Sequence, residues 1–248
     1  MASKERIDKL LVQQQLVGSR ERAKALILAG RVLVDDQVID KVGTQVDPAA
    51  AIRLKGEDIP YVSRGGLKLA KALDSFDLSV SGRTAIDVGA STGGFTDCLL
   101  QNGAAKVFAV DVGYGQLAWK LREDSRVVNL ERTNIRHLTA EQLDATPDLA
   151  VIDASFISLD KVLPVTLSLL KPGSDIVALI KPQFEVGKGK VGKGGVVRDP
   201  QQHVQVVEKI KLLAERLGCR IVAVCDSPVL GPKGNREFLI HLRMEITS

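Results

Sequence analysis

The chain has 248 residues, of which 45% are hydrophobic and 26% charged, so it can bury a substantial core and remain soluble. No apolar run approaches the roughly 18–20 residues of a membrane-spanning helix, and the charged N-terminus does not resemble a signal peptide. Three cysteines without metal-ligand spacing predict reduced thiols and a cytoplasmic protein. The net charge of +4 is a mild indication of an anionic partner.

Residues 1–60 are predicted to form a small unit of two short helices followed by hairpins. The apolar residues of "KERIDKLLVQQQL" have helical spacing, and a second helix is expected after Ser19, which is placed as its N-cap. Gly30 stands where a helix ends in a left-handed residue. Two short strands, "RVLV" and "QVID", are then expected around a tight turn at Asp35 and Asp36.

The run from Ser19 to Val46 resembles the S4 RNA-binding domain, a small α+β fold, although Asp36 stands where that family often has Gly. The resemblance implies that the second helix and the start of the first strand contact RNA phosphates. The basic residues at those places are Arg20, Arg22, Lys24 and Arg31. The alternative is an ordinary solvated helix face, because residues 1–60 carry ten basic and nine acidic residues. Clustering of the cations on one element favours RNA binding.

The second unit is predicted to span residues 61–248, with the boundary near Asp58–Tyr61 in a segment that contains Gly and Pro. A helix is expected over "LKLAKALDSF", after which apolar strands alternate with helical patterns. This alternation predicts an α/β fold with a mostly parallel, Rossmann-like sheet that binds its ligands at the carboxyl ends of strands. The expected strands are 84–88, 106–111, 127–130, 149–153, 176–181, 220–225 and 237–243.

The stretch "DVGASTGGFTD" connects the first of these strands to a helix, and three ligand motifs can be compared with it. It fails the dinucleotide fingerprint G-x-G-x-x-G, because Ser91 takes the second glycine position. "GASTG" matches the nucleophile elbow G-x-S-x-G, but no convincing acid-bearing loop precedes any histidine to complete a triad. The stretch fits the first motif of S-adenosylmethionine (SAM) methyltransferases through Asp87, Gly89, Ser91, Gly93 and Gly94.

The physical chemistry of this turn suits SAM. Glycines allow the backbone to approach a ligand closely, and the helix N-terminus after Gly94 favours a carboxylate. Asp111 ends the next strand, where its carboxylate can accept hydrogen bonds from both ribose hydroxyls. The alternative for Asp111 is a simple helix cap on "YGQLAWK", and no role is assigned to Phe95 or Asp97.

A later segment, "FEVGKGKVGKGGVVRDP", contains five Gly and three Lys between Gly187 and Gly195. It matches the P-loop up to the lysine, but Gly194 replaces the Ser or Thr that would hold Mg²⁺, so an NTPase is rejected. Two interpretations of residues 186–198 are left open: a mobile cationic lid that RNA binding orders, and a plain surface loop.

Four charged residues stand next to predicted strand ends or on the opening helix: Lys68, Asp153, Lys181 and Glu237. Charges beside buried strand ends are costly unless they are paired, so a shared cluster is plausible. Taken singly, each has a structural alternative, such as a solvated lysine or a carboxylate that caps a turn.

The order Lys–Asp–Lys–Glu on these elements resembles the catalytic tetrad of FtsJ-like RNA ribose 2′-O-methyltransferases. Together with the S4 pattern, the segments "DVGASTGGFTD", "DASFIS", "KPQFE" and "NREFL" resemble the TlyA family over nearly the whole chain. That family carries both the name hemolysin and the name ribosomal RNA 2′-O-methyltransferase. The resemblance implies SAM as cofactor, ribosomal RNA or ribosomal subunits as partner, and cytidine as the target nucleotide.

In this interpretation Lys181 is the base or the group that orients the ribose hydroxyl, and Lys68, Asp153 and Glu237 shape its position and charge. No metal is needed, and the sequence offers no His/Cys cluster for one. Two other hypotheses are a cytolysin and a non-catalytic RNA-binding factor of the ribosome. A pore former needs a membrane-spanning or strongly amphipathic segment, and none is evident. A pure binder has no reason to retain two lysines and two acids at strand ends.

Overall fold

The computed structural model describes residues 4–55, 59–187, 189, 191–192 and 194–246, and it divides into two compact units, Met1–Pro60 and Tyr61–Ser248. In the first unit the strands form an antiparallel sheet of order β3-β2-β5 and a separate pair, β1-β4. Its elements are β1 (Glu5–Arg6), α1 (Ile7–Gln13), α2 (Arg20–Leu28), β2 (Val32–Val34), β3 (Gln37–Ile39), β4 (Gln45–Val46) and β5 (Ile52–Leu54).

The local signals of the first unit have the structural effect that the sequence predicts. The Ser19 side chain accepts the backbone N–H of Arg22 at 3.1 Å and so caps α2. Gly30, just beyond the end of that helix, has φ +64°. Asp35 and Asp36 form the two-residue turn between β2 and β3, and both adopt positive φ although neither is Gly. The turn therefore keeps its short length at the cost of backbone strain.

The second unit contains a seven-stranded sheet of order β11-β12-β10-β9-β6-β7-β8, in which β12 runs antiparallel to both of its neighbours. This confirms the predicted α/β fold. Each predicted strand is present, with ends that differ by a residue at most: β6 (Thr84–Val88), β7 (Lys106–Val110), β8 (Val127–Leu130), β9 (Leu149–Ile152), β10 (Asp175–Ile180), β11 (Cys219–Asp226) and β12 (Phe238–Met244).

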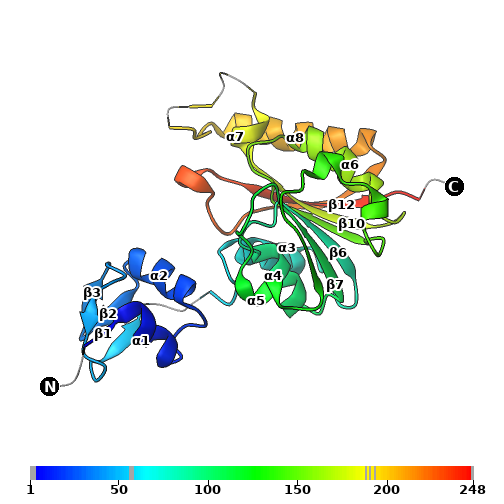
Figure 1. Ribbon diagram of the computed structural model, residues 1–248. Coiled ribbons are helices and arrows are strands. Elements are labelled where there is room, and N and C mark those ends of the chain that lie inside the picture. Colours follow the sequence, from blue (N-terminus) through cyan, green and yellow to red (C-terminus); the bar gives the residue numbers. More distant parts are fainter. Residues whose placement is uncertain (1–3, 56–58, 188, 190, 193, 247–248) are drawn as a thin grey trace. The chain divides into compact units, whose positions relative to one another are not determined.

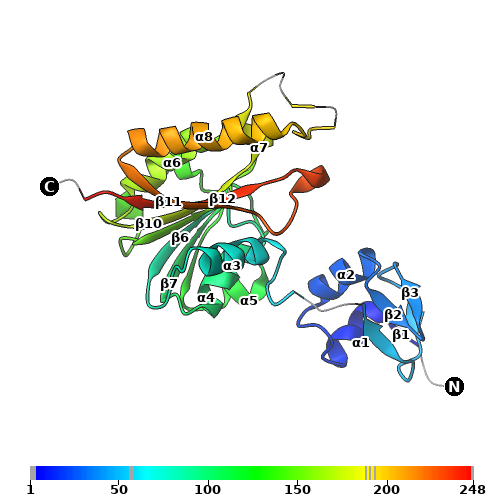
Figure 2. The ribbon, with the colours of Figure 1, turned by 180° about the vertical axis from the view of Figure 1, so that it is seen from behind.

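Helices cover both faces of this sheet, and two apolar cores result (Figure 1). Seen from behind, α3 and α4 lie on one side of the strands and α6 and α8 on the other (Figure 2). One face carries α3 (Gly65–Ser75), α4 (Gly94–Gln101) and α5 (Trp119–Arg122), and the other carries α6 (Leu159–Ser168), α7 (Pro182–Glu185) and α8 (Pro200–Arg216). Short 3₁₀ turns are η1 (Ile135–His137), η2 (Ala140–Gln142) and η3 (Pro232–Gly234).

The order of the strands reverses beside β6, and this reversal fixes the place of the site. From β6 the chain continues outward through β7 and β8, and it then returns to place β9 on the other side of β6. Gly89 follows β6 and Asp153 follows β9, so both stand at the carboxyl edge of the sheet at the reversal. Open α/β sheets bind ligands at such a point.

Candidate active site

A pocket of about 330 Å³ opens at the carboxyl ends of β6, β9 and β10. Three of the four predicted catalytic residues line it: Lys68, Asp153 and Lys181. The Gly-rich turn after β6 contributes Gly89–Thr92 and Gly94 to the same pocket. The sequence-predicted catalytic and cofactor residues therefore meet at the strand reversal.

Lys181 is held by the loop between β9 and α6. Its Nζ lies 2.6 Å from Asp153 Oδ1, and it donates hydrogen bonds to the Asp153 carbonyl oxygen at 3.1 Å and to Ser155 Oγ at 2.8 Å. Lys181 is buried with a side chain only 7% exposed, whereas that of Asp153 is 21% exposed. Lys181 therefore borders the pocket with little exposed surface, and Asp153 Oδ1 beside it is buried as well.

Lys68 forms a second and more deeply buried ion pair. Its Nζ lies 2.6 Å from Glu237 Oε2, with side chains 10% and 0% exposed. Lys68 stands in the first turns of α3, and Glu237 immediately precedes β12. Gly231 makes room for this carboxylate, because a Cβ at that position would lie 2.0 Å from Glu237 Oε1. All four predicted tetrad residues are thus brought to one place, as two lysine–carboxylate pairs.

The glycines of the turn serve packing as well as ligand approach. Gly89 has φ +88°, and a Cβ there would lie 3.0 Å from the backbone of Ala154. Gly93 also has positive φ and lies against Leu121 rather than in the pocket lining. A Cβ on Gly94 would lie 2.8 Å from the backbone nitrogen of Gly66. Gly93 and Gly94 therefore let α4 pack closely on its neighbours, a role that the motif alone does not reveal.

Asp87 lies beneath the turn and is fully buried. Burial, with smaller contributions from the nearby charges of Asp153 and Asp111, raises the pKa of its carboxyl from 3.8 to about 7, against a hydrogen bond from Thr96 that lowers it. Thr96 Oγ1 donates to Asp87 Oδ2 at 2.7 Å, while Oδ1 has no hydrogen-bond partner in the described part of the chain. A buried carboxylate with an unused oxygen below a ligand-binding turn is suited to a cationic group.

Asp111 follows β7, and its carboxylate accepts hydrogen bonds from two loops. Its Oδ2 accepts the backbone N–H of Ser91 at 2.8 Å, and its Oδ1 accepts that of Gly113 at 2.7 Å. The helix expected on "YGQLAWK" begins only at Trp119, with Ala118 at its N-cap, so the alternative of a helix cap is wrong. Asp111 instead fixes the Gly-rich turn against the following strand end.

Three polar residues with long-range contacts escaped sequence reasoning. Asp97, to which no role was assigned, accepts the backbone N–H of Val62 at 2.8 Å and pairs with Lys120 at 2.9 Å. Glu185 accepts hydrogen bonds at the N-terminus of α6, and Ser155 contacts Lys181. The partners of these residues are more than twenty positions away in the sequence. The only indication in the sequence was the family resemblance of the segments "DASFIS" and "KPQFE", which contain Ser155 and Glu185.

The predicted RNA-binding residues of the first unit differ in their surroundings. Arg20 forms an ion pair with Asp8 at 2.6 Å, and Arg31 donates to the Lys55 carbonyl oxygen at 2.9 Å. Lys24 is exposed on α2, and Arg22 is partly buried. Asp8 is nearly buried, and its hydrogen bonds with arginines lower the pKa of its carboxyl to about 2. Arg20 is therefore held in place by a carboxylate that stays ionised.

The Gly/Lys-rich segment is described only in part, since Lys188, Lys190 and Lys193 lie outside the described residues. The C-terminal part of this segment is hydrogen-bonded to the loop that precedes β12. Asn235 is buried, donates to the Gly195 carbonyl oxygen at 3.0 Å and accepts the Val197 N–H at 3.1 Å. The two interpretations of this segment both stand.

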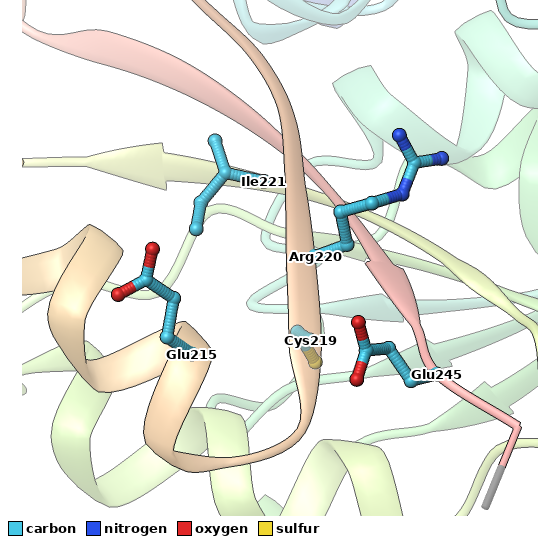
Figure 3. Close-up of a pocket in the computed structure, with 5 residues that line it drawn as sticks. All are labelled: Glu215, Cys219, Arg220, Ile221 and Glu245. Carbon is cyan, nitrogen blue, oxygen red and sulfur yellow. The ribbon is translucent and has the colours of Figure 1, made fainter.

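A second pocket lies at the opposite edge of the sheet, where β11 begins (Figure 3). It is lined by Glu215, Cys219, Arg220, Ile221 and Glu245, with Glu215 and Ile221 on one side of the strand and the Arg220 guanidinium on the other. Burial raises the pKa of the Cys219 thiol to about 11, which leaves it unreactive at neutral pH. This pocket is remote from the four clustered residues and offers no catalytic arrangement.

The fold and the pocket at the strand reversal are those of a SAM-dependent methyltransferase. The family model described as FtsJ-like methyltransferase matches residues 61–244, and the S4 domain model matches residues 5–52. None of the helices in the described ranges has both the length and the apolar character to span a bilayer.

Similar proteins carry two kinds of name. The 16S/23S rRNA (cytidine-2′-O)-methyltransferase TlyA of Mycobacterium tuberculosis is 49% identical over 99% of this chain and 92% of its own. Hemolysin A of Brachyspira hyodysenteriae is 40% identical over 95% and 98%. A solved structure of a candidate hemolysin from Streptococcus thermophilus has 45% identity and a TM-score of 0.79, covering 100% of this chain and 90% of that one.

The chain therefore belongs to the TlyA family, which joins an S4 domain to an FtsJ-like methyltransferase domain. The names hemolysin and methyltransferase are used within this one family. The cofactor of such a domain is SAM.

Proposed function

We propose that this chain methylates the ribose 2′-hydroxyl of a cytidine in ribosomal RNA. The relative from M. tuberculosis carries that activity in its name at 49% identity. The observation that supports the proposal most strongly is the Lys181–Asp153 pair, which lies at the pocket beside the cofactor turn. A buried amine next to an open pocket is suited to taking a proton from a hydroxyl.

The residues at the strand reversal fit SAM, by the geometry of the turn and by the unused carboxylate oxygen of Asp87. Asp87, Gly89, Ser91, Gly93, Gly94 and Asp111 would form its site. In this proposal Asp111 would accept ribose hydroxyls, and Asp87 would attract a positive group of the cofactor. When bound, SAM supplies an electrophilic methyl group and a good leaving group.

In this proposal Lys181 takes the proton that the ribose oxygen loses on methylation. Asp153 holds the amine in place through its carboxylate and its carbonyl oxygen. Lys68 and Glu237 form a second, closed ion pair, of which Lys68 lines the same pocket. Much of the acceleration comes from alignment of the hydroxyl with the methyl group, which rigid buried pairs provide.

The S4 unit would dock structured RNA, and Arg20, Arg22, Lys24 and Arg31 are the proposed phosphate contacts. Phe156 offers a further contact in the catalytic unit, because it is 91% exposed on the loop that holds Lys181. An exposed aromatic ring at a ribose-modifying site is suited to stacking on an unpaired base. We place the protein in the cytoplasm, where ribosomal RNA is found.

The test is methyl transfer from SAM to isolated ribosomal subunits and to naked rRNA, followed by digestion to nucleosides and mass spectrometry. The proposal expects 2′-O-methylcytidine, whose methyl remains on the sugar fragment when the base is lost. A methyl group on the base fragment would contradict the ribose assignment, and a different methylated ribonucleoside would contradict cytidine.

A further inference from the structure

The loop between β9 and α6 surrounds Lys181 Nζ with three oxygen atoms. These are Asp153 Oδ1, the Asp153 carbonyl oxygen and Ser155 Oγ, at 2.6, 3.1 and 2.8 Å. The contacts with the carbonyl oxygen and Ser155 Oγ are hydrogen bonds, whereas the contact with Oδ1 is an ion pair of the ammonium form that lacks hydrogen-bond geometry. A base must instead be neutral, with two donors and one lone pair, and the lone pair then has to face one of these oxygens.

The three oxygens differ in what they can do when the amine is neutral. The Asp153 carboxylate, when ionised, and its carbonyl oxygen are acceptors only, so a lone pair directed at either would be repelled. The Ser155 hydroxyl can both accept and donate. When the amine is neutral, Ser155 can turn its hydrogen toward Nζ while Nζ keeps its hydrogen bond to the Asp153 carbonyl oxygen.

Ser155 is the more accessible of the two residues. Both line the pocket, but Ser155 is exposed, whereas the Lys181 side chain is only 7% exposed. A substrate hydroxyl that enters the pocket can therefore reach Ser155 Oγ without displacing either contact of Lys181 with Asp153. A base within one hydroxyl of its substrate can work through that hydroxyl.

The position of Ser155 is fixed from the far end of its loop. Glu185 Oε2 accepts the Ser158 hydroxyl at 2.6 Å, and Glu185 Oε1 accepts the Leu159 N–H at 2.7 Å at the start of α6. Lys209 pairs with the same carboxylate at 3.0 Å. Because Lys181 and Glu185 belong to one short segment, that segment holds both ends of the loop.

We infer that Ser155 is a proton relay between the substrate hydroxyl and Lys181, an inference that rests on the proposed function. As the ribose oxygen is methylated, its O–H bond breaks and the proton passes to Ser155 Oγ. The original Oγ–H proton passes to neutral Lys181 Nζ at the same time. Ser155 ends as a hydroxyl and Lys181 as an ammonium group, which returns the proton to solvent before the next turnover.

The experiment compares single-turnover methyl transfer to ribosomal subunits by the full chain and three variants, Ser155→Ala, Ser155→Thr and Ser168→Ala, at saturating SAM between pH 6.5 and 9.5. Ser168→Ala is the matched control, since its exposed hydroxyl donates only to the Val165 carbonyl oxygen within α6. SAM affinity is measured by calorimetry and folding by thermal unfolding. The chain without substitutions serves as the reference.

We expect Ser155→Ala to lose about 30- to 100-fold in rate at every pH, with SAM affinity within about twofold of the reference. Ser155→Thr, which keeps a hydroxyl, and Ser168→Ala should both stay within about fivefold. An Ala variant within about threefold of the reference would overturn the relay. Equal losses of rate in all three variants would also overturn the relay. Recovery of the Ser155→Ala rate at high pH would overturn it too, because Ser155 would then only influence the charge state of Lys181. Failure of the unsubstituted chain to methylate RNA would contradict the proposed function itself.

Discussion

A lysine–carboxylate pair lies on each of two walls of the pocket: Lys68 with Glu237 on the first, and Lys181 with Asp153 on the second. On one wall Lys68 and Glu237 are almost completely removed from solvent, and Gly231 leaves just enough space for the carboxylate. On the other wall Lys181 is buried, but its partners Asp153 and Ser155 border the open pocket. The first pair is enclosed, whereas the second includes a hydroxyl that borders the pocket. We therefore expect substitutions on the first wall to act mainly on stability and substitutions on the second mainly on methyl transfer.

The largest expected effect is on the second wall. Lys181→Ala should reduce methyl transfer by at least about 10³-fold, because the proposed base is removed, while SAM affinity changes by less than about threefold. The measurement is radiolabel transfer to rRNA together with calorimetric SAM binding. Lys171→Ala, an exposed lysine that lies 3.9 Å from Asp148, is the control and should remain fully active. An active Lys181→Ala variant would remove the distinction between the walls.

On the first wall the main effect should be on stability. Lys68→Met leaves the Glu237 carboxylate buried without its partner, and we expect a loss of about 3 kcal/mol in the free energy of unfolding. Denaturant unfolding measures it, and Lys71→Met, an exposed neighbour on α3, should change stability by less than about 0.5 kcal/mol.

Substitution of both partners sharpens this test. A variant with Lys68→Met and Glu237→Met should recover most of the lost stability, because no charge remains uncompensated, and yet remain impaired in catalysis. If the double variant lost as much free energy of unfolding as the two single variants together, the unpaired buried charge would not be the reason for the loss in Lys68→Met.

The buried carboxyl of Asp87 should make the stability of the fold and the affinity for SAM depend on pH in opposite directions. Its pKa is raised from 3.8 to about 7, so the folded state binds the proton more tightly than the unfolded state. The resulting stabilisation is fully present below pH 3.8 and is lost as pH rises through 7. At 1.36 kcal/mol per pH unit it amounts to up to roughly 4 kcal/mol.

The test is Asp87→Asn, which does not titrate. Its thermal stability relative to the unsubstituted chain should improve as pH rises from 5 to 8.5, while its SAM affinity falls about tenfold at pH 8 because the carboxylate charge is missing. A stability difference independent of pH would contradict the raised pKa.

The smallest effects are expected in the S4 unit. Lys24→Ala should weaken rRNA binding by about three- to tenfold and reduce the salt dependence of binding by about one counterion. Methyl transfer at saturating RNA and SAM affinity should not change. Fluorescence titration at several salt concentrations is the measurement, with Lys41→Ala, an exposed lysine outside the proposed contacts, as the control. Equal effects of the two substitutions would contradict the assignment of α2 as the phosphate-binding face.

Sequence pattern was sufficient for the features that depend on local chemistry. Apolar runs located every strand of the sheet, and charges at the strand ends identified Lys181 and Asp153, because an ion next to a buried strand needs a partner. Ser19 and Gly30 delimited α2 for equally local reasons.

The remaining features depend on contacts that form only in the folded chain. Nothing local shows that Ser155 faces Lys181 or that Asp97 binds Val62, since these partners are brought together by the packing of separate elements. The start of α5 was predicted too early for the same reason. The Ala118 N–H bonds to the Thr92 carbonyl oxygen at 3.1 Å, and this tertiary contact holds the preceding residues out of the helix.

The measurement that tests the central claim most directly is the alkali resistance of the methylated product. RNA labelled from radioactive SAM is hydrolysed with base, which cleaves only next to a free 2′-hydroxyl. The account predicts label in an alkali-resistant dinucleotide with the unsubstituted chain and none with Lys181→Ala. Label released as ordinary mononucleotides would show that the methyl group is not on the ribose, and the assignment of the lysine walls to hydroxyl chemistry would then be wrong.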